Sequence, residues 1–425
     1  MSLLIKNAII VNPDAVASQP QDILLEKGSI AKIAPAIGDS SAKIIDATGK
    51  FVLPGLVDLH VHLREPGRED KETIETGSRS AVKGGFTTIF CMPNTNPVID
   101  HAMIVDAILK EAKRVNLTNV IPIGAITKGQ KGEELADMEE LKNAGCLALS
   151  DDGKAVFNSQ LMRHALEYAK MLGLLLIQHC EDPHLSNHGS MNEGINSTLL
   201  GLKGIPGVAE TIIVARDIEL VHYLKTKIHF AHMSLKRSVE LIRFAKSQGI
   251  QITAEVCPHH FTLTDDAVRS FHTHTKVNPP LRTQDDVDAL KEGLKDGTID
   301  CITTDHAPHT AEEKEFEYDR APFGMIGLET ALGLSVTELI DKKILTWPQL
   351  VGKMSTMPAK ITGLSLKGEI RVGKDADLTI VDPDKEWVVK KEEFSSKSKN
   401  SPFIGRKLKG VVETTVCGGR IVYEH

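Results

Sequence analysis

The sequence feature that most constrains the fold is a repeated alternation of short apolar segments with longer segments of helical periodicity. Eight apolar segments of strand length follow one another over about 250 residues in the middle of the chain. They are residues 56–62, 86–92, 120–124, 146–150, 174–179, 228–232, 251–256 and 300–304. Helical spacing separates most of them, at 72–83, 103–115, 160–172, 209–224 and 239–248. This pattern predicts an α/β fold of the (β/α)8 barrel type, with functional groups at the carboxyl ends of the strands.

An open, doubly wound sheet would show the same alternation. That fold usually carries a glycine-rich phosphate loop after its first strand, and no such loop follows residue 62. The barrel is therefore the favoured architecture.

The two ends of the chain have a different pattern, made of short strands and turns. Strand-like segments occupy 3–11, 22–33 and 43–46 at one end, and 377–382, 410–417 and 420–423 at the other. Turn residues separate them, among them Gly418 and Gly419. Because neither end has enough strands to bury a face alone, we predict one small β domain built from both ends. The predicted domains are residues 1–52 and 365–425 for this unit and 53–364 for the barrel.

Charge and cysteine content exclude several classes of protein. The chain has 50 basic and 57 acidic residues, a net charge of −7, which argues against a nucleic-acid or membrane-surface footprint. Its six cysteines show no C-x-x-C spacing and no apolar leader precedes them, which favours a reducing cytoplasm. Its apolar stretches are too short to span a membrane. No nucleic-acid or membrane partner is therefore implied.

The first barrel strand carries a His-x-His pair. Side chains alternate between the two faces of a strand, so the polar residues of this segment are expected to share one face. They are Asp58, His60, His62 and Arg64, opposite Val57, Leu59, Val61 and Leu63. Two imidazoles on one face can bind one metal ion. A lone His-x-His is equally compatible with two core histidines, so the evidence must come from the other strands.

Polar residues also close most of the other predicted strands. They are Asn94, the pair Asp151 and Asp152, His179, His232, and Asp305 followed by His309. In a barrel, four histidines and two carboxylate positions at strand ends would face one small volume. The histidines elsewhere, His229 among them, are expected to be surface or core residues.

These residues stand in motifs that run in a recognisable order along the whole chain. The motifs are VDLHVHLREPG at 57–67, MPNT at 92–95, SDDG at 150–153, HCE at 179–181, AHMS at 231–234, VNPPLR at 277–282 and TDHAPH at 304–309. In these motifs the chain resembles the dihydroorotases of the amidohydrolase superfamily, in the class that bridges its metals with an aspartate.

The resemblance implies two zinc ions per subunit. One zinc would be held by His60, His62 and Asp305, and the second by His179 and His232. Asp152 would bridge the two ions. Many relatives bridge with a carbamylated lysine, for which Lys154 is the nearest candidate, but one carboxylate already supplies two oxygen donors. Asp151 is the weaker choice because the residue next to an inward-facing strand position points away.

The resemblance also implies roles in substrate binding and proton transfer. Asp305 would take a proton from the attacking water and deliver it to the leaving nitrogen. The substrate-contacting positions would be His62, Arg64, Asn94, Asn278 and His309, with the backbone of Phe323 and Gly324 over the ring. Arg64 suits a ring carboxylate, although a surface ion pair is the alternative. Asn278 could equally be a turn residue, and the charged segment 311–320 either a lid or a solvated loop.

The function implied is that of a zinc-dependent hydrolase that interconverts dihydroorotate and carbamoyl aspartate in pyrimidine synthesis. A hydantoinase, dihydropyrimidinase or allantoinase is the alternative enzyme. An inactive relative that assembles with aspartate transcarbamoylase is the alternative from another class, disfavoured because every ligand position is filled. The chain is expected to form a homo-oligomer, most simply a dimer, and an active enzyme could dock the same partner.

Overall fold

The computed structural model describes residues 2–38 and 41–425, and its centre is a ring of eight parallel strands. The strands are β6 (Leu56–Val61), β7 (Phe86–Cys91), β8 (Asn119–Pro122), β9 (Ala148–Ser150), β10 (Leu175–Gln178), β13 (Lys227–Phe230), β14 (Gln251–Val256) and β15 (Cys301–Ile302). Neighbouring strands pair in parallel in two series, β6-β7-β8 and β9-β10-β13-β14-β15, which follow the order of the chain. Parallel bridges from Gly124 to Leu149 and from Val61 to His306 close the ring. The predicted barrel is confirmed.

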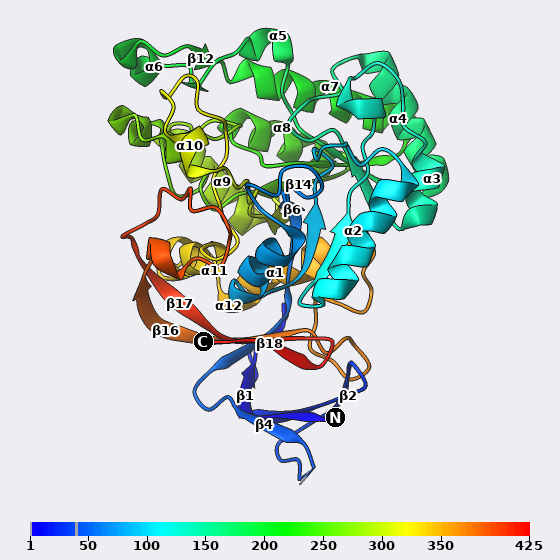
Figure 1. The fold of residues 1–425 in the computed structure, drawn as a ribbon, viewed down its shortest axis with the longest axis vertical. Coiled ribbons are helices and arrows are strands. Elements are labelled where there is room, and N and C mark those ends of the chain that lie inside the picture. The colour runs from blue at the N-terminus through cyan, green and yellow to red at the C-terminus, as the bar shows by residue number, and fades with distance from the viewer. Residues whose placement is uncertain (1, 39–40) are drawn as a thin grey trace.

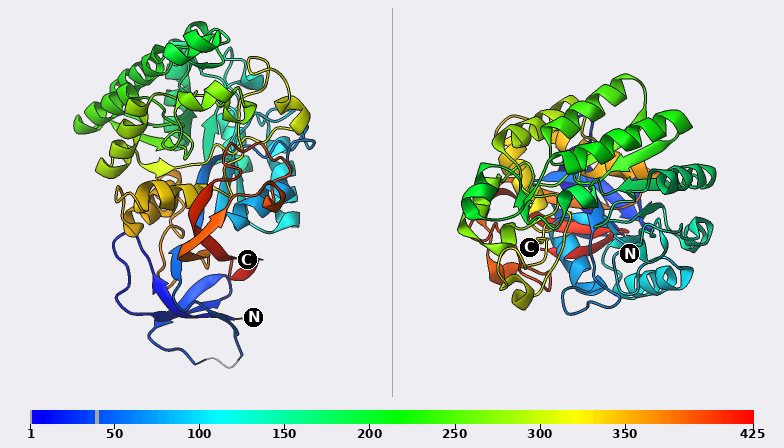
Figure 2. Two further views of the ribbon diagram at one scale, coloured as in Figure 1. Left: turned by 90° about the vertical axis from the view of Figure 1, so that its left-hand side faces the viewer. Right: turned by 90° about the horizontal axis from the view of Figure 1, so that it is seen from above.

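Helices surround the strands, as the view from above in Figure 2 shows. The main ones are α1 (Ile74–Lys83), α2 (Ala102–Val115), α3 (Met138–Ala144), α4 (Ser159–Leu172), α7 (Val208–Leu224), α8 (Lys236–Ser247), α9 (Gln284–Asp296) and α11 (Ala331–Ser335). The last continues into the π-helical turn η4 (Val336–Ile340). After a turn, a second helical stretch is made of α12 (Trp347–Val351), the π-helical η5 (Gly352–Thr356) and α13 (Met357–Thr362). Local sequence fixes several helix ends: Thr73 forms a capping box at the start of α1, and Gly173 ends α4 in the left-handed conformation.

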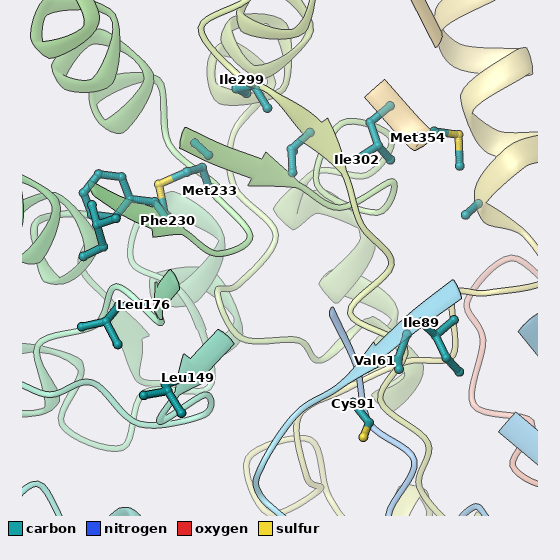
Figure 3. Close-up of a cluster of buried hydrophobic side chains, with 14 of the residues drawn as sticks. Val61, Ile89, Cys91, Leu149, Leu176, Phe230, Met233, Ile299, Ile302 and Met354 are labelled. Atoms are coloured by element: carbon teal, nitrogen blue, oxygen red, sulfur yellow. The ribbon is translucent and has the colours of Figure 1, made fainter. Parts of the chain in front are cut away.

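Apolar side chains fill the space between strands and helices. Figure 3 shows part of this core, in which Leu149, Leu176 and Phe230 from neighbouring strands lie close to one another. A second, smaller cluster that includes Leu59, Phe90 and Ile177 is formed mainly by other residues of the same barrel strands. The strands are therefore mainly apolar on both faces, and the polar functional side chains lie at their ends.

The short elements that remain lie on loops between the barrel strands and helices. They are η1 (Lys128–Gln130), α5 (Pro183–Ser186), β11 (Met191–Asn192), α6 (Ile195–Leu200), β12 (Gly204–Ile205), η2 (Asp265–Ser270), η3 (Thr273–Thr275), α10 (Ala311–Lys314) and, near the C-terminus, η6 (Lys391–Glu393). Within the described residues, none of the helices is long and apolar enough to cross a membrane.

The chain ends form one sheet below the barrel, seen at the bottom of Figure 1. Its strands are β1 (Leu3–Ile10), β2 (Gln21–Glu26), β3 (Ser29–Ala34), β4 (Lys43–Asp46), β5 (Phe51–Pro54), β16 (Leu378–Val388), β17 (Lys407–Cys417) and β18 (Arg420–Glu424). Their order is β18-β17-β16-β5-β1-β2-β3, with β4 also paired to β1. The antiparallel pairing of β5 with β16 joins the two ends. The predicted small β domain is confirmed, while its boundaries at 52 and 365 stay a prediction.

The predicted alternation along residues 57–64 is wrong in its second half. The pairing of β6 with β7 shifts register between Asp58 and Val61, and β6 ends at Val61. Val57 and Leu59 consequently lie in the smaller cluster and Val61 in the larger one. A register shift of this kind changes the direction of the side chains that follow it.

Candidate metal centre and substrate pocket

Asp152 is the centre of a group of imidazoles at the carboxyl ends of the strands. It follows β9, and its Oδ1 atom lies 3.3 Å from His60 Nε2, 3.4 Å from His232 Nε2 and 3.5 Å from His179 Nδ1. Its Oδ2 atom lies 3.4 Å from His62 Nε2. One carboxylate therefore contacts histidines at the carboxyl ends of β6, β10 and β13, through both of its oxygens.

Asp305 follows β15 and lies beside the same two histidines of β6. Its Oδ1 atom is 3.1 Å from His62 Nε2 and 3.5 Å from His60 Nε2. The set His60, His62 and Asp305 places one ligand atom of each residue within 4.8 Å of the others, and so does the set His60, Asp152 and His232. His179 completes the group, because its Nδ1 is 2.9 Å from His232 Nε2. All six predicted ligands thus meet at one place.

The polar atoms in this group fit a bound cation. His60 Nε2 and Asp152 Oδ1 are buried and have no hydrogen-bond partner. Unpaired buried polar atoms are costly in a folded protein unless an ion or water satisfies them. Four imidazoles and two carboxylates also form a donor set that divalent metals such as zinc accept.

The pKa values of Asp152 and His179 are strongly shifted in the chain without metal. Although burial opposes it, the neighbouring imidazoles of His60, His179 and His232 hold the pKa of Asp152 well below its ordinary value. Burial also opposes a charged His179. The neighbouring carboxylates of Asp152 and Glu181 nevertheless raise its pKa to about 10. Since a metal ligand must be the neutral imidazole, metal binding has to release protons here.

A second acceptor orients three of the four histidines. His60 Nδ1 lies 2.8 Å from Glu255 Oε1, His62 Nδ1 2.8 Å from Asn94 Oδ1, and His179 Nε2 3.3 Å from Glu181 Oε2. Such partners fix the ring so that its other nitrogen faces the centre.

Sequence reasoning missed Glu255, which is fully buried in β14. It also contacts His229 Nε2, at 2.9 Å, and accepts the backbone N–H of His232. A charged residue within the apolar segment 251–256 was the signal that could have revealed it, because a buried charge requires a partner. His229 is a buried residue outside the centre.

Among the described residues, neither alternative to Asp152 has a recorded contact with the imidazoles. Asp151 accepts hydrogen bonds from the backbone N–H groups of Ile126 and Thr127, which hold the 126–127 turn. Lys154 is exposed, at the lining of a cavity of about 190 Å³ that also touches His179. The geometry favours Asp152 as the bridging group.

Arg64 reaches the centre by a route that the sequence did not predict. It lies beyond the end of β6 with a left-handed φ of 61°, and its Nε donates to Pro308 O at 3.2 Å. Burial lowers the pKa of its guanidinium to about 10, which leaves it charged at neutral pH. Within residues 2–38 and 41–425, no carboxylate forms an ion pair with Arg64. A half-buried cation without a counter-ion is suited to an anionic ligand.

The other predicted substrate positions surround the same space. His309 Nε2 lies 3.4 Å from Arg64 Nη2 and 2.7 Å from Phe323 O. Gly324 has a φ of 130°, and a Cβ there would lie 3.1 Å from His309 Nε2. Asn278 donates to Glu181 and leaves its buried Oδ1 unpartnered. Asn94 contacts His62, as described above, so its amide also orients a member of the metal centre.

Comparison with known proteins agrees with this geometry. The family "Dihydro-orotase-like" matches residues 49–238, and the "Amidohydrolase family" matches residues 241–423. A dihydroorotase of Pelotomaculum thermopropionicum is 54% identical over 424 residues, which cover 100% of this chain and 99% of the relative. A dihydroorotase of Acetivibrio thermocellus is 55% identical over 420 residues, 99% of this chain and 98% of the relative.

The chain belongs to the dihydroorotase family. It is therefore an enzyme of the cyclic amide hydrolase type. Among solved structures, the L-hydantoinase of Arthrobacter aurescens is similar with a TM-score of 0.88 and 28% identity, covering 99% of this chain and 96% of that chain. The fold is thus shared with hydantoinases, while the sequence is much closer to the dihydroorotases.

Proposed function

We propose that the chain interconverts dihydroorotate and N-carbamoyl aspartate, as the names of its relatives suggest, with two zinc ions. The observation that carries this proposal is the half-buried guanidinium of Arg64, which lies beside the metal centre with no carboxylate paired to it in the part of the chain that the structure describes. Dihydroorotate bears a ring carboxylate, and a planar guanidinium binds a carboxylate through two parallel hydrogen bonds. Uncharged rings such as hydantoin would leave this cation without a partner.

The six ligands divide into two sets. His60, His62 and Asp305 would hold one zinc, His179 and His232 the other, with Asp152 between them. Zinc bound there would lower the pKa of water towards neutrality and polarise the amide carbonyl oxygen.

The residues of the chain supply the rest of the chemistry. Asp305 is held ionised by the neighbouring His60 and the hydrogen bond with His62, although burial opposes it, so it can accept the proton of the attacking water. The same carboxyl then donates that proton to the ring nitrogen as the amide opens. Arg64 and His309 fix the ring carboxylate, and burial of the site excludes bulk water.

Four further positions complete the proposed pocket. Asn94 and Asn278 present side-chain amides, and Phe323 and Gly324 present backbone groups on the side of His309. These contacts would hold the ring in one orientation over the centre.

The test is the Arg64→Met variant, assayed with dihydroorotate, hydantoin and allantoin alongside zinc content. We expect kcat/KM for dihydroorotate to fall on the order of 100-fold, because the charge pair between Arg64 and the ring carboxylate is lost, with zinc content unchanged. Arg79→Met is the matched control, since Arg79 is exposed and pairs with Glu75 on α1. An unchanged rate with dihydroorotate in Arg64→Met, or a wild-type preference for hydantoin, contradicts the proposal.

We further propose that the chain works in the cytoplasm as a homodimer and can dock aspartate transcarbamoylase. All six cysteines are buried and free, which suits a reducing compartment. Ile195 and Leu199 project from α6 with 79% and 73% of their surface exposed, which offers an apolar contact for another protein. Analytical ultracentrifugation of the chain alone and with aspartate transcarbamoylase tests both associations, and a monomer that binds no partner contradicts them.

A further inference from the structure

His309 is held by four groups, and their chemistry is not equivalent. Its Nε2 lies 2.7 Å from the carbonyl oxygen of Phe323, and its Nδ1 lies 3.2 Å from Lys71 Nζ and 3.0 Å from Glu313 Oε2. The fourth group is Arg64, whose Nη2 is 3.4 Å from Nε2. His309 and Lys71 are each only 6% exposed, so water does not compete for these contacts.

The contacts decide which nitrogen of the ring carries the hydrogen. A carbonyl oxygen only accepts, so the short contact with Phe323 requires a hydrogen on Nε2. Burial and the nearby cations Arg64 and Lys71 lower the pKa of His309 to about 2, so the ring is neutral and carries one hydrogen. The lone pair on Nδ1 can then accept from the ammonium of Lys71, and it cannot bind the carboxylate of Glu313.

Glu313 favours the opposite arrangement. Its carboxylate is on α10, 3.0 Å from Nδ1, and acting alone it would attract the hydrogen to that nitrogen. Lys71 prevents this by binding both groups, since its Nζ is also 2.8 Å from Glu313 Oε2. Arg68 binds the other oxygen of Glu313 at 2.8 Å and holds the carboxylate in place.

The state of His309 matters for the proposed substrate carboxylate. With its hydrogen on Nε2, His309 and Arg64 present two donors 3.4 Å apart to one point. An incoming carboxylate can accept from both, whereas a bare Nε2 lone pair would repel it. The carbonyl of Phe323 is the acceptor that His309 uses in the free chain.

We infer that Lys71 is a positioning residue, which holds His309 against the pull of Glu313 in the tautomer that donates from Nε2 to the ring carboxylate of the substrate. This inference rests on the proposed function, because it assigns a role towards a carboxylate-bearing ring. The ion pair of Lys71 with Glu313, together with that of Arg68, joins two loops that are far apart in sequence, the one after β6 and the one after β15.

The test combines Lys71→Met with the double variant Lys71→Met/Glu313→Met. We expect Lys71→Met to raise KM for dihydroorotate about 10-fold with less than about 3-fold change in kcat, since one hydrogen bond to a charged group is misdirected. Nitrogen-15 NMR of histidine-labelled protein should show His309 move from the Nε2–H to the Nδ1–H tautomer. The double variant should return both KM and the tautomer towards wild type, because the competing acceptor is gone.

Lys397→Met is the matched control, since this exposed lysine only donates its side chain to the backbone oxygen of Glu69. A merely structural role for Lys71 predicts a double variant worse than the single one, and that result overturns the inference. So does a Lys71→Met protein with unchanged tautomer and KM. If Lys71→Met does not fold, two other variants decide. Lys71→Arg must keep the hydrogen on Nε2 of His309, and Glu313→Met must leave KM for dihydroorotate within about 3-fold of the wild-type value. Failure of the wild type to turn over dihydroorotate would instead refute the proposed function.

Discussion

The small β domain and the mouth of the barrel use buried residues in opposite ways. The β domain buries aliphatic side chains such as Leu3, Ile23 and Val416, and its pairing follows from the local alternation of each strand. The mouth of the barrel buries Asp152, Asp305 and several cations, which cost free energy unless they are paired.

The buried residues of the two regions therefore have different physical causes. Burial in the β domain is explained by stability, because apolar area removed from water stabilises the fold. Burial of charge in the mouth is explained by the metal ions and the anionic substrate that we propose these charges bind. Substitutions in the two regions should therefore separate stability from activity.

The largest effect is expected for Asp152→Ala, in the mouth of the barrel. Loss of the carboxylate that lies between the imidazoles should remove bound zinc and lower kcat/KM by about 1000-fold or more, since the metals supply several kcal/mol of transition-state stabilisation. Metal analysis and steady-state kinetics measure both. An Asp152→Ala enzyme with two zinc ions and full activity would show that the site is assembled differently.

The next effect is on stability and belongs to the β domain. Ile23→Ala, at a side chain with no exposed surface, should lower the free energy of unfolding by about 3 kcal/mol and leave kcat/KM of the folded enzyme unchanged. Val16→Ala, at a side chain that is 41% exposed, is the control and should cost less than about 0.5 kcal/mol. A 10-fold loss of kcat/KM in folded Ile23→Ala, detected by kinetics below its unfolding transition, would mean that the two regions are coupled.

A smaller effect is expected for Gly324→Ala at the substrate pocket. The new Cβ would require a strained φ of 130° and would lie 2.8 Å from Ala307 Cβ, so the loop must shift His309. We expect KM for dihydroorotate to rise about 10-fold, measured at saturating zinc. Gly38→Ala is the control because a Cβ there meets no atom within 4 Å. Equal KM values in both variants would separate Gly324 from substrate binding.

The smallest effect is a pH dependence in the loop after β15. Burial, with repulsion from Lys276, lowers the pKa of Lys314 to about 7, whereas an unfolded lysine keeps an ordinary pKa near 10.5. Above pH 7 the unfolded loop thus binds a proton that the folded loop does not, so the local stability of residues 311–320 should rise with pH. Hydrogen exchange at pH 6.5 and 8.5, corrected for intrinsic rates, measures it. Lys314→Met should lack the dependence, and a loop that loses protection at pH 8.5 contradicts the argument.

The fold was largely predictable from the sequence because its signals are local. Periodicity marks each strand and helix, and the rule that strand ends face one mouth brings His60, Asp152, His179, His232 and Asp305 together. The small β domain was predictable because neither β-rich end has enough strands to bury a face alone.

The surroundings of the site were less predictable because they depend on contacts between distant residues. Glu255 is 195 residues from His60 in the sequence, and nothing in the segment around Glu255 identifies His60 as its partner. Arg64 reaches the pocket through a left-handed residue after a register shift, which strand alternation cannot anticipate. The ion pair of Lys71 with Glu313 needs the packing of two separate loops.

The most direct test of the central claim is anomalous diffraction at the zinc absorption edge from crystals of the purified enzyme. The account predicts two peaks on either side of the Asp152 carboxylate, one against His60, His62 and Asp305 and the other against His179 and His232. Zinc peaks away from these residues, or His179 and His232 found remote from His60, would contradict it.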